Sequence, residues 1–298
     1  MNYPPAAQML ADFAPQRGFF VGIDSDGCAF DVMELKHKEC YIPFLIKHWN
    51  LQPISKFARE TWEFVNLYSR WRGLNRWLAL VKTLDLLRER PAVKKRGVEI
   101  PVVPRVREFI ADDAYPKSDS GLRAYKTAHP DPELETAYAW TTEANAFVGE
   151  IVHGIPPFPY VGASLELLAS KADLIVISGT QTEAVKREWE EHDIAKYTRV
   201  VAGQEMGSKS LHLKLATSGK YAPNHVLMIG DAWSDWEAAY ANGALFYPIN
   251  PKHEDASWQR FYEEAALKFL NGEYAGAYQA ALIAQFEARL PDVPPWED

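Results

Sequence analysis

The sequence has few cysteines, no excess of positive charge and no long apolar run. Its two cysteines, Cys28 and Cys40, are too few for a disulfide-stapled scaffold. The first residues lack the basic-then-apolar order of a secretory signal, so we expect a cytoplasmic chain without a disulfide. The net charge of −8 argues against nucleic acid or a membrane surface as a partner. No apolar run approaches the roughly 18 residues of a membrane span.

Five short apolar runs indicate the strands of one sheet. They are unbroken rather than alternating, which is typical of parallel strands covered on both faces. Helical stretches separate the later runs, so the sequence predicts a doubly wound, Rossmann-like α/β sheet. With 298 residues, of which 47% are hydrophobic, the chain can build one large domain or two. The runs lie at 18–23, 174–177, 199–202, 226–229 and 244–247.

Three helices between these strands carry start or stop signals. Thr180-Gln-Thr-Glu183 has the form of a capping box and predicts a helix that opens there. Ser208 is placed to cap the next helix, and Gly219 follows its expected end. A third helix is expected over 232–242, closed by Gly243.

The segment between the first and second strands is far longer than a crossover needs. A parallel connection takes about a dozen residues, whereas this segment predicts a series of helices and no clear strand. We therefore expect an inserted all-helical domain over 33–152 that returns through the proline-rich stretch 153–159. The core domain then comprises 1–32 and 153–298, with a C-terminal helical extension over about 252–298. The helices of the insert are expected near 41–50, 55–66, 74–90, 104–111 and 131–150.

Acidic and hydroxyl side chains follow three of the predicted strands. In doubly wound sheets, ligands bind beyond the carboxyl ends of the strands. A carboxylate there can attack phosphorus, and a second one can move protons. Oxygen ligands suit Mg²⁺, while a hydroxyl, a main-chain N–H and a lysine can hold phosphoryl oxygens. The residues are Asp24 and Asp26, Ser178 and Gly179, Asp231 and Asp235, together with Lys209 at the start of a helix.

Each of these short patterns is weak alone. Asp-x-Asp-Gly often forms a solvated turn, and Gly-Asp-x-x-x-Asp fits any capped helix. An EF-hand is excluded, because its loop has glycine at the sixth position and Glu at the twelfth, where this chain has Leu35. What distinguishes this sequence is that all the patterns occur together, in order, each at a strand end.

In that order the motifs resemble the haloacid dehalogenase-like (HAD) superfamily, in particular its hydrolases with a helical C1-type cap. The motifs are "FVGIDSDG", "DLIVISG" ending at Ser178, Lys209 in "GSKSLHLKLA", and "HVLMIGDAWSDWEAA". They cover about 15–32 and 155–250. The insert corresponds to the cap only by its placement. Cys28 stands where family members usually have Thr.

The resemblance implies a role for each residue. Asp24 would be the nucleophile and Asp26 the general acid/base, while Ser178, Gly179 and Lys209 would bind the phosphoryl group. A Mg²⁺ ion would be held by Asp24, Asp231, Asp235 and the main-chain carbonyl of Asp26. The acid at position 26 favours a phosphatase that acts on a small phosphorylated substrate through an aspartyl-phosphate.

Several alternatives remain beside these assignments. Lys196, Lys214 and Lys220 compete with Lys209 for the phosphate-binding role. Arg70, Arg72 and Arg76 would recognise substrate, or would belong to an amphipathic helix with Trp71 and Trp77 in its core. A phosphomutase, a phosphonate hydrolase and a non-catalytic phosphate-binding protein are the rival functions. The phosphonate hydrolase would need a reactive lysine in the insert, for which Lys36, Lys38, Lys47 and Lys56 are available.

Overall fold

The computed structural model describes residues 3–296, and these residues form two compact units. The first comprises 3–32 and 154–289, and the second comprises 33–153 and 290–296. The chain therefore passes between the units three times, near Val32, His153 and Arg289. Among the described helices, none combines the length and the apolar character needed to cross a membrane.

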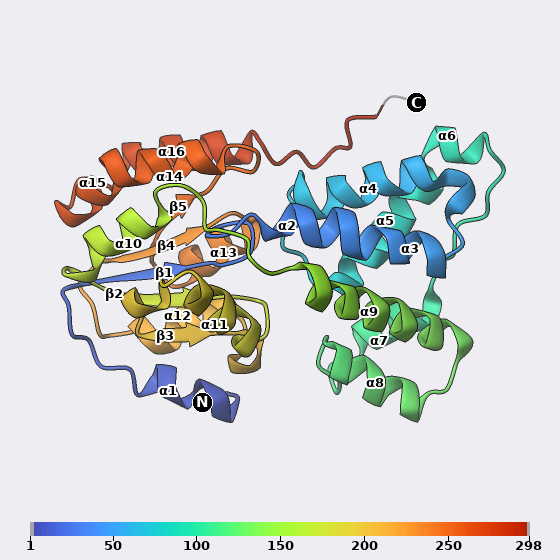
Figure 1. Cartoon of the computed structure of the whole chain (residues 1–298), viewed down its shortest axis with the longest axis horizontal. Helices are drawn as coiled ribbons and strands as arrows, with labels where there is room; N and C mark the ends of the chain where they lie inside the picture. The colour runs from blue at the N-terminus through green and yellow to red at the C-terminus, as the bar shows by residue number, and fades with distance from the viewer. Residues whose placement is uncertain (1–2, 297–298) are drawn as a thin grey trace. The chain divides into compact units, whose positions relative to one another are not determined.

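The first unit is built on a five-stranded parallel sheet with the order β3-β2-β1-β4-β5 (Figure 1). This confirms the α/β fold class, and each strand lies within two residues of its predicted bounds. The central strands are almost wholly buried, which explains why their sequences are continuously apolar. The strands are β1 Phe19–Ile23, β2 Ala172–Ile177, β3 Val200–Ala202, β4 Val226–Gly230 and β5 Leu245–Pro248.

The strand order places a topological switch between β1 and β4. From β1 the chain continues to β2 and then β3 on one side, whereas β4 and β5 lie on the other side. Right-handed crossovers therefore put the connecting helices on both faces of the sheet. Ile23 of β1 pairs with Val176 of β2 and with Ile229 of β4, so these three strands end at nearly the same level. The switch point is where such sheets bind ligands.

The helices of the first unit differ from the sequence expectations in a few places. Ser208 caps α12 as predicted, since its Oγ accepts the N–H of Leu211 at 3.2 Å. The capping box at Thr180 is wrong: α11 begins at Thr182 after Gln181, and the Thr180 hydroxyl bonds elsewhere. The helix α10 was not predicted. The helices are α1 Gln8–Ala11, α10 Val161–Ala169, α11 Thr182–Glu191, α12 Lys209–Thr217 and α13 Trp233–Ala241.

The C-terminal extension packs on the far edge of the sheet through α16 and through Tyr274. The Tyr274 hydroxyl donates to the carbonyl of Phe246 in β5 at 2.8 Å. The extension consists of α14 Glu254–Arg260, a π-helical segment Phe261–Ala265, α15 Ala266–Leu270 and α16 Ala277–Glu287.

The proline-rich return stretch is hydrogen-bonded to the segment by which the chain leaves the first unit. The N–H of Phe158 donates to the carbonyl of Ala29 at 2.9 Å, and Phe30 forms an antiparallel bridge with Pro157. The two connecting segments are therefore paired rather than independent, a feature that the linker-like composition did not indicate.

The second unit is all-helical in its described residues (Figure 1). Buried tryptophans belong to its hydrophobic core. The Trp62 and Trp140 rings lie 5.7 Å apart, and those of Trp77 and Trp140 lie 5.9 Å apart, both edge-to-face. Its elements are α2 Val32–Leu35, a π-helical segment Lys36–Tyr41, α3 Ile42–His48, α4 Ser55–Leu67, α5 Arg76–Glu89, α6 Pro91–Lys94, α7 Pro104–Ala111, α8 Asp119–Ala128 and α9 Pro132–Ile151.

The helix α8 was missed because Gly121 lowers helix propensity near its start. That glycine is required by packing, since a Cβ there would lie 1.8 Å from the carbonyl oxygen of Pro116.

The tail from Leu290 onward belongs to the second unit, whereas the sequence placed the whole extension with the core. The Trp296 ring packs edge-to-face on Phe64 at 5.4 Å, and the Arg90 guanidinium lies 4.4 Å from its centroid. The N–H of Arg70 donates to the carbonyl of Pro291 at 3.4 Å. Short polar and aromatic tails carry no periodic signal, so this contact has no signature in the sequence.

Candidate active site

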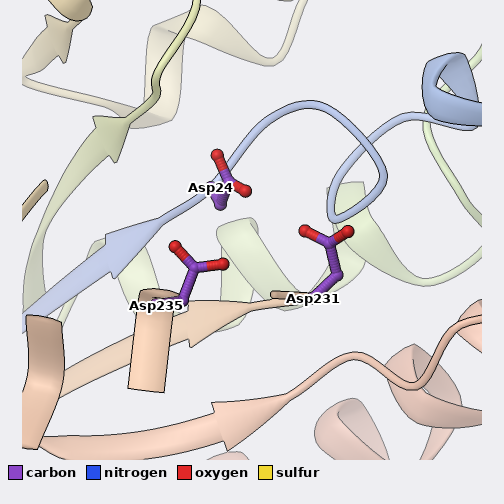
Figure 2. Close-up of side chains that lie close together, drawn as sticks. All are labelled: Asp24, Asp231 and Asp235. Carbon is purple, nitrogen blue, oxygen red and sulfur yellow. The ribbon is translucent and has the colours of Figure 1, made fainter. Parts of the chain in front are cut away.

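Three aspartates converge at the switch point of the sheet. Asp24 directly follows β1, Asp231 directly follows β4, and Asp235 lies in the first turn of α13. Their carboxylate oxygens lie within 4.8 Å of one another, and all three side chains are buried. Figure 2 shows the three carboxylates with oxygens facing a common space. The structure thus brings together three of the acids that the sequence placed at strand ends.

Main-chain contacts fix the position of this cluster. The N–H of Asp24 donates to the carbonyl of Ile229 at 3.0 Å, and Oδ1 of Asp24 accepts the N–H of Ser25 at 2.8 Å. Gly230 allows α13 to approach, because a Cβ there would lie 2.4 Å from Cβ of Asp235. Oδ2 of Asp235 accepts the N–H of Ala232 at 3.1 Å, which closes the first turn of the helix.

Lys209 bridges two of the carboxylates. Its Nζ lies 2.8 Å from Oδ2 of Asp24 and 2.6 Å from Oδ1 of Asp235. It is the first residue of α12, where the Ser208 cap sets the direction of the helix.

The three rival lysines lie in other surroundings. Lys196 pairs with Asp193, Lys214 is exposed, and Lys220 donates to the carbonyl of Leu215 at 2.8 Å. Of the four candidates, the structure therefore brings Lys209 to the acids.

The cluster carries more negative than positive charge. Burial raises the pKa of Asp24 and of Asp235, and Lys209 opposes that shift in both cases. Burial alone would lower the pKa of Lys209, but the facing carboxylates, Asp235 foremost, outweigh it and raise that pKa. Three carboxylates around one ammonium group leave a site that favours a further cation.

Asp26 is held by the loop that follows β2. Its Oδ2 accepts the hydroxyl of Thr180 at 2.9 Å. Ser178 is buried, and its Oγ accepts the N–H of Thr180 at 3.1 Å. Gly179 is exposed and has open space where a Cβ would stand. Ser178 and Gly179, two of the predicted phosphate-binding residues, and Asp26, the predicted acid/base, therefore lie in two loops that hydrogen-bond to each other.

Cys28 now has a structural account. Its side chain is fully buried, and Sγ lies 3.7 Å from the carbonyl oxygen of Ile229, the same carbonyl that binds the N–H of Asp24. Burial raises the pKa of the thiol. The thiol therefore serves as a weak donor to the end of β4 rather than as a reactive group.

The three arginines proposed for specificity make contacts within the second unit. Nη1 of Arg72 donates to the carbonyl of Leu67 at 2.9 Å, and the side chain is buried. Nη2 of Arg76 donates to the hydroxyl of Tyr41 at 2.7 Å. Arg70 lies 3.7 Å from Asp292 of the tail. A role in substrate recognition stays a prediction for all three.

The helix expected over 74–90 is present as α5, but the alternative in which it also includes Arg70, Arg72 and Trp71 is wrong. Residues 69–73 form turns between α4 and α5, and the helix begins only at Arg76. Trp77 lies in the core of the unit, whereas Trp71 is half-buried and packs on Phe64 at 5.7 Å. Asn75 caps α5 by accepting the N–H of Trp77 at 3.1 Å.

Sequence reasoning missed three residues that contact the loop 24–30 after β1. Thr180 was predicted in a capping box, and neither Trp189 nor Trp258 was singled out by the sequence. For the two tryptophans, the one available signal was the indole N–H group itself. A buried indole N–H usually finds a hydrogen-bond acceptor.

Comparisons with known proteins gave structural likenesses alone. No family model matches the chain, and no curated protein does. The chain is similar to a haloacid dehalogenase-like hydrolase from Streptococcus pneumoniae, with 14% identity, a TM-score of 0.42, and 81% of this chain and 90% of the other covered. A provisionally assigned phosphoglycolate phosphatase from Lactobacillus delbrueckii subsp. bulgaricus has 13% identity, a TM-score of 0.47, and coverage of 88% and 100%.

A provisionally assigned beta-phosphoglucomutase from Thermotoga maritima has 16% identity, a TM-score of 0.38, and coverage of 77% and 84%. The solved structures that this chain resembles thus include HAD-superfamily hydrolases, and the activity proposed below rests on the side chains of the site.

Proposed function

We propose that the chain is a magnesium-dependent phosphatase that hydrolyses a small phosphate ester through an aspartyl-phosphate on Asp24. The observation that carries this proposal is the buried cluster of Asp24, Asp231 and Asp235 at the carboxyl ends of β1 and β4, in which Lys209 bridges Asp24 and Asp235. A second acid, Asp26, lies two residues from the nucleophile and is oriented by Thr180.

The donor set fits a magnesium ion. The carboxylates supply hard oxygen ligands, and their charge exceeds that of the lysine among them. Asp24, Asp231 and the main-chain carbonyl of Asp26 would hold the ion, with Asp235 as a further ligand or a support. When bound, the ion would neutralise the repulsion between the nucleophile and an anionic phosphate.

The nucleophile is held by its neighbours. The N–H of Ser25 binds Oδ1 of Asp24 at 2.8 Å, and Lys209 binds Oδ2 at 2.8 Å, so the carboxylate has one orientation. An oxygen of Asp24 attacks phosphorus, and the bond from phosphorus to the ester oxygen breaks. Lys209, Ser178 and the N–H of Gly179 would receive the phosphoryl oxygens.

Asp26 carries the protons in this scheme. Its carboxylic acid donates a proton to the departing ester oxygen, and the resulting carboxylate then accepts a proton from water. That water attacks the phosphorus of the aspartyl-phosphate, releases inorganic phosphate and regenerates Asp24. The hydrogen bond from Thr180 to Oδ2 of Asp26 orients this carboxyl group.

The surroundings of Lys38 do not favour the Schiff-base chemistry of a phosphonate hydrolase. A Schiff-base lysine needs a lowered pKa so that its amine is neutral. Burial would lower the pKa of Lys38, but hydrogen bonds to Glu34 and Tyr68 outweigh it, and the net shift is upward. Lys47 pairs with Glu143, and Lys56 lies 3.8 Å from Glu60. Lys38, Lys47 and Lys56 thus each lie beside a carboxylate.

Asp24→Asn tests the proposal against a matched control. The control is Asp173→Asn, which alters another buried aspartate that forms an ion pair. Asp173 lies opposite Phe20 in the strand register, near the other end of the strands. With an aryl phosphate as substrate, Asp24→Asn and EDTA should each abolish phosphate release, and folded Asp173→Asn should keep it. Activity that survives in Asp24→Asn or in EDTA would overturn the proposal.

We further propose that the second unit is a cap that sets specificity, with Arg70, Arg72 and Arg76 as the residues to vary. We would rank candidate substrates by the rate at which the protein releases phosphate from sugar phosphates, nucleotides and phosphorylated acids. Sugar phosphates that isomerise without phosphate release would point to a mutase instead. The free cysteines, Cys28 and Cys40, support a reducing compartment such as the cytoplasm.

A further inference from the structure

The C-terminal extension contacts the loop that carries the catalytic acids. Nε1 of Trp258, in α14, donates to the carbonyl oxygen of Cys28 at 2.7 Å, and the Trp258 side chain is fully buried. We propose that Trp258 is a positioning residue for the loop 24–30, which holds Asp24 and Asp26 in the geometry that phosphoryl transfer needs. The inference rests on the proposed function and assigns a role to a segment outside the sheet.

The loop is tightly wound but leaves the Cys28 carbonyl for an outside donor. Gly27 has φ of 76°, a conformation that favours glycine. The carbonyl of Ser25 accepts three N–H groups, from Cys28 at 3.2 Å, Ala29 at 2.8 Å and Phe30 at 3.2 Å. These bonds set the shape of the loop, while its placement depends on contacts from other elements.

A second tryptophan contacts the loop near its start. Nε1 of Trp189, in α11, donates to Oγ of Ser25 at 2.9 Å, and that Oγ lies 3.2 Å from a carboxylate oxygen of Glu188. The Trp189 ring also packs edge-to-face on Phe30 at 5.9 Å. Two buried indoles from helices far apart in the sequence therefore hold the loop, one at Ser25 and one at Cys28.

Trp258 is itself tied to the sheet. Its ring packs edge-to-face on Phe261 at 5.6 Å, and Phe261 packs on Tyr247 of β5 at 4.9 Å. The hydroxyl of Tyr247 donates to the carbonyl of Ser257 at 2.5 Å. The contact between Trp258 and Cys28 thus joins the loop to β5, whereas the loop follows β1 directly.

Losing the indole N–H should affect the reaction more than the fold. A buried carbonyl left without its donor favours any rearrangement that gives it a new partner. Cys28 lies two residues after Asp26, so such a rearrangement moves the acid/base. Displacements of about 1 Å from reacting geometry can reduce a rate by about 10²-fold. We expect a smaller displacement here, with a loss of about tenfold in kcat.

The test compares Trp258→Phe with Tyr274→Phe. Tyr274 is also a buried residue of the extension that donates to a main-chain carbonyl, at 2.8 Å, but its acceptor is Phe246 in β5. With an aryl phosphate, Trp258→Phe should lower kcat about tenfold and leave KM close to wild type. Tyr274→Phe should lower the melting temperature and keep the wild-type kcat. Replacing Trp258 with 3-benzothienylalanine, which keeps the ring size and lacks the N–H, should reproduce the loss in kcat.

Hydrogen–deuterium exchange supplies a readout that does not depend on activity. In Trp258→Phe, exchange should rise in the peptide that covers 24–32 and stay unchanged in the peptides that cover β2 and β4. Wild-type kcat in both the Trp258→Phe and the benzothienyl variants would overturn the proposal, as would equal losses of kcat in Trp258→Phe and Tyr274→Phe. If the wild type hydrolyses no phosphate ester, the proposed function fails, and unchanged exchange at 24–32 would still refute the positioning role.

Discussion

Lys209 and Asp24 form an ion pair in which Nζ lies 2.8 Å from Oδ2, and the same Nζ lies 2.6 Å from Asp235. One ammonium group thus orients the proposed nucleophile and balances part of the charge of the cluster. The contact depends on two local features of the chain, the Ser208 cap that starts α12 and the position of Asp24 at the end of β1.

Lys209→Met should reduce phosphatase activity by at least about 10²-fold, because it removes the positive charge that, in the proposed mechanism, would stabilise the transferring phosphoryl group. It should also lower the free energy of unfolding by about 3 kcal/mol, since it leaves buried carboxylates without their partner. Lys214→Met in the same helix is the matched control, because Lys214 is exposed. Steady-state kinetics and chemical denaturation measure both effects, and equal behaviour of the two variants would contradict the role of Lys209.

Magnesium should stabilise the protein through the three carboxylates. At a concentration of 100 Kd, a ligand that binds only the folded state adds about 2.7 kcal/mol to the free energy of unfolding. Asp231→Asn should lose most of this gain, because it removes one ligand from the cluster. Asp173→Asn should retain the full gain in a magnesium titration followed by melting temperature. A magnesium response that survives in Asp231→Asn would place the ion elsewhere.

Most of the sheet and its acidic cluster could be predicted from the sequence, since both depend on local signals. The five strands are continuous apolar runs, and Asp24, Asp231 and Asp235 follow strands or begin helices. Parallel strands bring their carboxyl ends to one edge of the sheet. A residue that directly follows a strand in the sequence is therefore expected at the site on that edge.

The supports of the site could not be predicted, because they join distant parts of the chain. Trp258 reaches Cys28 across most of the sequence, and the hydroxyl of Thr180 binds Asp26 instead of capping its own helix. Thr180 illustrates why. A threonine hydroxyl can cap a helix in a capping box, and it can equally form a hydrogen bond to a residue far away in the sequence. Which of the two bonds forms depends on tertiary contacts, and the spacing of apolar residues in the sequence does not reveal those contacts.

Asp173 should stabilise the first unit in a pH-dependent manner. Its carboxylate lies 2.6 Å from Nη1 of Arg199, 2.8 Å from the hydroxyl of Tyr221 and 2.9 Å from the N–H of Gln16. Burial would raise the pKa of Asp173, but hydrogen bonds from Tyr221, Gln16 and Arg199 outweigh it, and the net shift is downward. Asp173→Asn should cost about 2–4 kcal/mol at neutral pH.

The sign of this pH dependence follows from the lowered pKa of Asp173. The stabilisation is fully present above the ordinary pKa of 3.8, and it is lost as the pH falls through the lower value of the folded state. Denaturation of wild type and Asp173→Asn at pH 7 and at successively lower pH below 4 measures the difference. A difference that does not shrink under acid would mean that the hydrogen bonds, rather than the charge, supply the stabilisation.

Gly230→Ala should displace Asp235 and disrupt the cluster. The added Cβ would lie 2.4 Å from Cβ and Cγ of Asp235, so the first turn of α13 must move. We expect a loss of about 1–3 kcal/mol from overcrowding, together with a weaker magnesium response. Gly18→Ala, just before β1, adds a Cβ with no neighbour within 4 Å and is the control. Equal melting temperatures in the two variants would contradict the tight approach.

Trapping the intermediate tests the central role of Asp24 most directly. The protein is quenched in acid during turnover of a phosphate ester, reduced with borohydride, which converts an aspartyl-phosphate to homoserine, and digested for mass spectrometry. We predict homoserine at position 24, only when substrate is present and not in Asp24→Asn. An unmodified Asp24 during active turnover, or homoserine at another aspartate, would contradict the proposed mechanism.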